Sequence, residues 1–145
     1  MMELEINEQI YGFNFGIGFL KEINKKVTMP DESVPKKMKE VGFKYYAAEL
    51  LDGDVLALIE ILKTANVGTE PRITEKMLSD YIDEESTDLD GLFEEVKDFL
   101  SKANATKKDY RKMQKAYEEQ KEEEEEQKKT AKAMRDTLLM KGETS

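Results

Sequence analysis

The acidic segment of residues 83–94 is the first place where the sequence could do chemistry, because its spacing is close to that of a calcium-binding loop. Oxygen-bearing side chains occupy the first, third, fifth and last positions of this window, as in an EF-hand. The sixth position, which needs glycine for a sharp turn, is Asp88, and the eighth, usually apolar, is Asp90. Both carboxylates suit the positive N-terminal end of a helix instead. The sequence therefore predicts no metal site here.

Gly16 and Gly18 lie where a predicted strand gives way to a predicted helix, which is the usual place of a phosphate-binding loop. The dinucleotide fingerprint requires a third glycine at the position of Lys21, and that glycine is missing. The two glycines are better explained by a tight turn. We expect no cofactor.

Catalysis has few candidate residues, because the chain contains no cysteine and no histidine. The usual thiol nucleophile, general base and metal ligands are therefore missing. Carboxylate pairs arise by chance among 32 acidic residues, and only Glu49 and Glu60 fall in apolar surroundings, at an expected boundary between helix and solvent. We expect that the protein is not an enzyme, and a metal-dependent enzyme is a distant third hypothesis.

The charge of the chain narrows the choice of partners. The formal net charge is -9 over 145 residues, so the surface repels phosphate backbones and anionic lipids. Apolar runs are far too short to span a bilayer, and the N-terminus has neither the basic nor the apolar region of a signal peptide. We expect a cytoplasmic protein that binds neither nucleic acid nor membrane.

The first half of the chain predicts a hairpin followed by helices. Apolar residues alternate over residues 3–15 around a turn at Asn7, which indicates an N-terminal β-hairpin. A short helix is expected over residues 17–23, a loop with two prolines over residues 28–36, and a helix over residues 41–51.

The second half is predicted to be helical, with recognisable helix starts. Asp54 is placed to cap a helix that runs to Asn66; this helix is apolar around most of its circumference and is the candidate for the central core helix. Thr74 caps the next helix, and the clearest helical periodicity begins at Asp88. Thr106 with Asp109 reads as a capping box that opens a long charged helix.

These elements predict a mainly α protein of the α+β kind. An N-terminal β-hairpin packs on a compact helical domain, and a long charged C-terminal helix follows. The apolar stripe of that last helix ends at Tyr117, so we place the folded domain at residues 1–117. Residues 118–145 form a charged tail, either helical or disordered, in which five consecutive glutamates repel one another.

Protein binding is the remaining function class, and a few apolar side chains are candidates for it. Most of the aromatic residues are expected in the core rather than on a recognition surface, by about four to one. Tyr45 and Tyr46 are adjacent and point to opposite faces of the element that holds them, so one of the two is a candidate for an exposed contact residue. Apolar residues near the C-terminus, including Met140, have no local cover, so they fold back or contact a partner. The predicted partner-binding residues are Tyr45, Tyr46, Tyr110, Met113, Tyr117, Met134, Leu138 and Leu139.

Four segments resemble one known family when they are taken together. They are residues 10–26 (IYGFNFGIGFLKEINKK), 48–58 (AELLDGDVLAL), 71–74 (PRIT) and 80–84 (DYIDE). As a set they resemble the tail assembly chaperones of long-tailed phages (siphoviruses) and of prophages of Gram-positive bacteria, over about the first 110 residues. The order of the predicted elements agrees with this resemblance.

The resemblance implies an assembly factor that is not part of the mature virion. Such a chaperone binds and solubilises the tape measure protein and helps bring tail tube subunits to it; self-association is kept open. The alternative is an acidic helical adaptor that oligomerises through its C-terminal helix as a coiled coil. A coiled coil needs apolar residues at two of every seven positions, and residues 118–132 interrupt that pattern.

Overall fold

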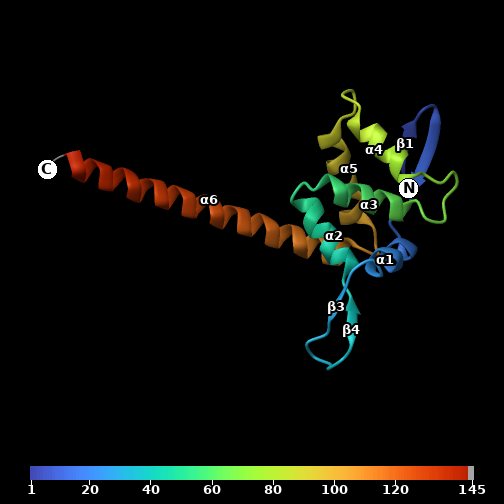
Figure 1. The fold of residues 1–145 in the computed structure, drawn as a ribbon, viewed down its shortest axis with the longest axis horizontal. Helices are drawn as coiled ribbons and strands as arrows, with labels where there is room; N and C mark the ends of the chain where they lie inside the picture. Colours follow the sequence, from blue (N-terminus) through green and yellow to red (C-terminus); the bar gives the residue numbers. More distant parts are fainter. Residues whose placement is uncertain (144–145) are drawn as a thin grey trace. The chain divides into compact units, whose positions relative to one another are not determined.

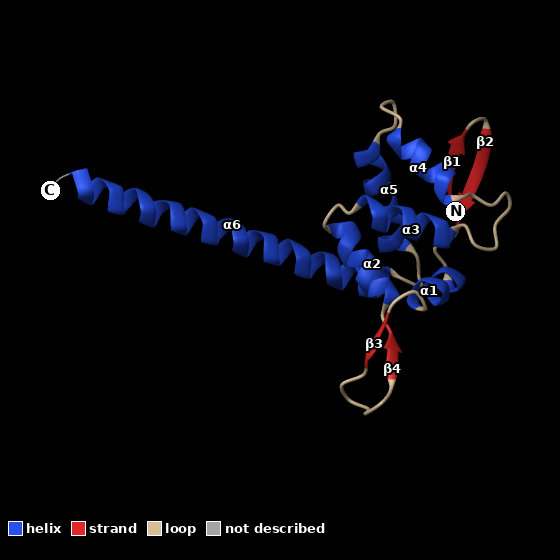
Figure 2. Ribbon diagram, in the orientation of Figure 1, coloured by secondary structure: helices blue, strands red, loops and turns tan. Residues whose placement is uncertain are grey.

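The computed structural model describes the backbone of residues 1–143 and the side chains of residues 1–139. It divides into two units, Met1–Arg111 and Lys112–Ser145. The described elements are mostly helices, with two short hairpins in the first unit (Figures 1 and 2). The predicted fold class, mainly α with an N-terminal hairpin and a long C-terminal helix, is confirmed.

The N-terminal hairpin forms as predicted from the alternation of its apolar residues. Strands β1 (Met2–Ile6) and β2 (Gln9–Phe13) pair antiparallel, with Ile6 opposite Gln9. The two turn residues, Asn7 and Glu8, both have positive φ, which gives the turn the twist that a two-residue hairpin needs. One face of the hairpin is buried, and the amide of Asn14 donates to the carbonyl of Ala65 at 2.8 Å. The hairpin is thereby attached to the helices.

Helix α3 (Val55–Ala65) is the centre of the first unit, as expected from its apolar circumference. It contacts α1 (Ile17–Asn24), α2 (Gly42–Leu51) and α4 (Glu75–Asp83). Its inward side chains, such as Leu58 and Leu62, are fully buried. Leu56, at the start of the helix, is 73% exposed, so the side of the helix on which Leu56 lies is apolar but is not buried.

The helix starts agree with the predicted caps at two of three positions. The Asp54 side chain accepts from the amide of Leu56, and the Thr74 hydroxyl accepts from the amide of Met77. The predicted capping box at Thr106 is wrong, because its buried hydroxyl donates to the carbonyl of Leu100, which closes the end of α5 (Leu89–Lys102). Helix α6 (Lys107–Glu143) nevertheless begins at the expected residue.

A second hairpin begins within residues 28–36, which were predicted to be a loop, and this corrects the sequence analysis. Strands β3 (Thr28–Pro30) and β4 (Met38–Glu40) pair antiparallel, with Met29 opposite Lys39. Every residue of both strands is exposed, and the hairpin extends away from the helices of its unit (Figure 2). With no buried face there is no alternation of apolar and polar residues to reveal a strand.

Residues 112–143 continue as helix throughout, so the tail is helical where it is described. The predicted domain boundary between residues 117 and 118 concerns which part folds alone. It stays a prediction.

Candidate protein-binding surfaces

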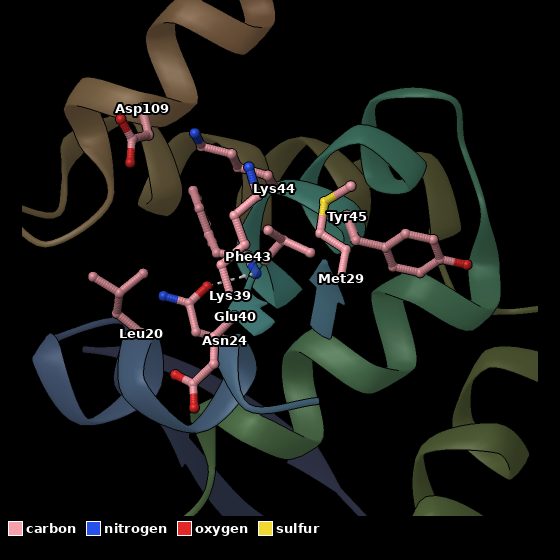
Figure 3. A pocket seen from close by; sticks show the side chains of 10 residues that line it. Leu20, Asn24, Met29, Lys39, Glu40, Phe43, Lys44, Tyr45 and Asp109 are labelled. Atoms are coloured by element: carbon pink, nitrogen blue, oxygen red, sulfur yellow. Dashed lines mark hydrogen bonds between the residues drawn. The ribbon is translucent and has the colours of Figure 1, made fainter. Parts of the chain in front are cut away.

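A groove lies at the root of the second hairpin, within the first unit. It has a volume of about 550 Å³ and is formed by α1, β4, the start of α2 and the first turn of α6 (Figure 3). Apolar side chains make much of its wall, with two lysines, two carboxylates and an amide among them. The lining residues are Leu20, Asn24, Met29, Lys39, Glu40, Val41, Phe43, Lys44, Tyr45 and Asp109.

The root of the groove is held by close contacts between α1 and the start of α2. A Cβ atom on Gly42 would collide with the carbonyl oxygen of Ile23, so no larger residue fits at this crossing. The side-chain oxygen of Asn24 accepts from the amide of Phe43 at 2.9 Å (Figure 3). The amide of Val41 donates to the carbonyl of Val27 at 2.8 Å, which ties the two ends of the hairpin together. These three contacts thus fix α1 and the second hairpin against the start of α2.

The second hairpin presents apolar side chains to solvent. Met29, Val34 and Met38 are 42%, 43% and 55% exposed. The loop at its tip is ordered by Asp31, whose carboxylate accepts from the amide and the hydroxyl of Ser33 at 3.0 and 2.7 Å. These bonds lower the pKa of Asp31 below its usual value, with the hydroxyl contributing most. None of these residues was predicted as partner-binding, because residues 28–36 were taken for a loop and residues 37–40 were assigned to no element.

Tyr45 and Tyr46 form an aromatic pair beside the groove. Their rings meet edge to face, with centroids 5.1 Å apart. Tyr45 is 50% exposed and lines the groove, whereas Tyr46 is half-buried. Partial burial raises the pKa of Tyr46, the carboxylate of Glu60 adds to this, and Lys26 opposes it. Of the eight predicted partner-binding residues, Tyr45 is the one that lines the groove.

Three other predicted residues lie on the first turns of α6, with different burial. Tyr110 is fully buried, so it belongs to the core of the first unit and offers no accessible surface. Met113 and Tyr117 are half-buried. The ammonium group of Lys121 lies 5.5 Å from the ring centroid of Tyr117, a cation–π contact within one helix.

The last three predicted residues lie near the end of α6, on the second unit. Met134, Leu138 and Leu139 are 65%, 69% and 64% exposed. Met140, which the sequence analysis grouped with them, lies outside the residues whose side chains are described.

The segments that could have done chemistry have structural roles. The Asp88 carboxylate accepts from the amide of Gly91 and caps α5, while the amide of Gly16 donates to the Asn14 side chain in the turn before α1. Glu60 pairs with Lys26 at 3.0 Å and with Lys63 at 3.8 Å. In the part of the chain that the structure describes, no group of three or more acidic side chains is placed to hold a metal ion. None of the helices described here combines the length and apolarity that a membrane span requires.

Comparisons with known proteins identify one family. A family model described as "Phage tail assembly chaperone protein, TAC" matches residues 3–115. A search of curated proteins gave no match, and a search of solved structures gave none either. The matched region covers both hairpins except Met2, and the helices α1–α5, and it includes every residue of the groove. The chain belongs to the phage tail assembly chaperone family.

Proposed function

We propose that this chaperone binds the tape measure protein of a long-tailed phage or prophage and keeps it soluble. It also assists the recruitment of tail tube subunits. It acts by protein–protein binding without catalysis, in the cytoplasm of the host cell, and is not part of the mature virion.

The observation that supports this proposal best is the groove at the root of the second hairpin. Met29, Phe43 and Tyr45 provide an apolar wall on a chain of net charge -9. A groove of this kind accepts the apolar face of an amphipathic helix, and flexible methionine side chains adapt to different partner sequences. A tape measure protein consists largely of long helices with apolar faces, as the family resemblance implies. The net negative charge of the whole chain then helps to keep the complex in solution.

Co-expression with the tape measure protein of the same phage tests the proposal. The wild-type chain should keep that protein soluble and co-purify with it, also at about 0.5 M salt, because apolar contacts are not screened. The double variant M29D/Y45D should reduce the co-purified amount at least about ten-fold, since loss of an interface anchor costs about 2 kcal/mol or more.

Leu56→Asp is the matched control for the groove variant. Leu56 is the most exposed large apolar residue of the first unit and does not line the groove. An acidic residue at its position, in the first turn of α3, is tolerated by the helix dipole. The control should bind like the wild type. Equal losses in both variants, or no co-purification at low and high salt with both proteins folded, would contradict the proposal.

A further inference from the structure

Charges along the exposed part of α6 are separated into two blocks of opposite sign. The acidic block, residues 118–126, contains seven glutamates and one lysine. The basic block, residues 128–135, contains Lys128, Lys129, Lys132 and Arg135 and no acidic residue. A random mixture of charges would serve solubility equally well. The separation therefore suggests a specific use.

The side chains of residues 118–139 are all exposed in the described helix. An isolated helix gains little from local pairs, each worth about 0.2–0.5 kcal/mol, and five adjacent glutamates reduce that gain. Four apolar residues accompany the charged blocks: Met113 and Tyr117, which are half-buried, precede them, Met134 lies within the basic block, and Leu138 follows it. A second helix is the occupant that would cover the exposed Met134 and Leu138, together with the accessible parts of Met113 and Tyr117, and also neutralise both blocks.

We infer that α6 pairs with α6 of a second copy of this chain, and that the two helices run antiparallel. In this direction the acidic block of each helix lies along the basic block of the other, so the attraction occurs twice. In a parallel pair the seven glutamates of one copy would lie along the seven glutamates of the other. Like charges at this density oppose association, so electrostatics selects the antiparallel direction.

Heptad spacing fixes the register of this pair. The seam, the stripe of residues that faces the second helix, consists of two positions in every seven, which alternate at intervals of three and four. One series is Tyr117, Glu124, Ala131 and Leu138, and the other is Met113, Gln120, Gln127 and Met134. In the antiparallel pair Tyr117 faces Met134 of the second copy, and Met113 faces Leu138.

The same register places the acidic block of each helix level with the basic block of the other. Along the axis Lys128 is level with Glu123 of the second copy, and Lys132 is level with Glu119. The paired helices have apolar layers at both ends and a polar centre at Glu124 and Gln127. A polar centre makes the association weaker than that of a coiled coil with a continuous apolar seam, and more sensitive to salt.

Sedimentation equilibrium of the full chain measures the association directly. We expect a monomer–dimer equilibrium at about 20 mM salt that weakens at least about ten-fold at 0.5 M, because the facing blocks are exposed and screened. The variant K128E/K129E/K132E/R135E has one acidic helix and the variant E119K/E122K/E123K/E126K has a basic one. Each should be monomeric alone, and a mixture of the two should dimerise. This mixing control shows that both variants are folded enough to associate.

Cross-linking determines the direction of the helices, and the absence of native cysteine makes it clean. Gln120→Cys faces Ala131→Cys in the inferred register, so a mixture of these variants should form a disulfide under mild oxidation. Each variant alone should not, because the two copies of residue 120 would be about 16 Å apart along the helices. A disulfide needs Cα atoms within about 7 Å.

Two results would overturn the inference. One is a monomer at all concentrations and at low salt. The other is preferential cross-linking of each cysteine variant with itself, which indicates a parallel pair. Neither experiment contains a tape measure protein, so their failure would leave the proposed chaperone function untouched.

Discussion

Asn66 is the side chain on which the attachment of the N-terminal hairpin depends, and its replacement by alanine is a sharp test of the fold. The residue is fully buried at the end of α3. Its amide nitrogen donates to the carbonyls of Gly12 at 2.9 Å and of Pro71 at 3.3 Å, and its oxygen accepts from the amide of Ile73 at 2.7 Å. One side chain thus links β2, α3 and the segment that precedes α4.

The cost of Asn66→Ala follows from the groups that lose their partners. Gly12 and Ile73 are themselves buried, so the Gly12 carbonyl and the Ile73 amide would be left without a hydrogen bond and largely without water. Each such group costs about 1–3 kcal/mol. We expect a loss of about 2–6 kcal/mol, against a total stability of about 5–15 kcal/mol for a small domain. The melting temperature should fall by about 10–20 °C.

Thermal unfolding followed by circular dichroism measures this loss. Asn104→Ala is the control, because Asn104 is exposed and the same chemical change there removes no buried hydrogen bond. The control should melt within about 2 °C of the wild type, as surface substitutions usually do. If Asn66→Ala also melts within about 3 °C of the wild type, the buried hydrogen bonds do not hold the hairpin and the reasoning is refuted.

Three further predictions concern the core, the tail and the second hairpin. Leu58→Asp places an unpaired carboxylate in the fully buried face of α3, which costs several kcal/mol, so the variant should be insoluble or unfolded by circular dichroism; an unchanged melting curve would show that this helix is peripheral. Removal of residues 118–145 should change the melting temperature by less than about 3 °C, because the side chains described in that segment, those of residues 118–139, are exposed and add little to the fold; a loss of many degrees would move the domain boundary. Ser33→Ala should raise the pKa of Asp31 toward its ordinary value of 3.8 in a carboxyl NMR titration, since the main hydrogen bond to its charged form is lost, and an unchanged pKa would contradict an ordered hairpin tip.

The helices could be predicted from the sequence because their signals are local. Asp54 and Thr74 precede apolar residues at helical spacing, and a cap depends only on the residues two or three positions further along. The N-terminal hairpin was equally readable, because one buried face imposes alternation on Met2, Leu4 and Ile6.

The groove could not be predicted, because it depends on contacts between distant segments. Gly42 against Ile23 and Asn24 against Phe43 bring α1 and α2 together, and nothing in either segment alone indicates the crossing. The second hairpin lacks a buried face, and its prolines favoured a loop. Tyr110 was predicted to contact a partner but is fully buried, whereas Met113 and Tyr117 on the same stripe are half-buried. The periodicity of the stripe is regular and does not indicate where along the helix the core ends. Only Tyr45 was both predicted as a contact and found in the groove.

Size-exclusion chromatography with light scattering, applied to the chain co-expressed with its tape measure protein, tests the central claim most directly. A chaperone that covers a long helical partner should elute with it in one peak, whose mass corresponds to one tape measure chain and several copies of the chaperone. The peak should persist at about 0.5 M salt, because apolar contacts in the groove lead the binding. A soluble tape measure protein that elutes separately from the chaperone, or one that stays insoluble in its presence, would contradict the account.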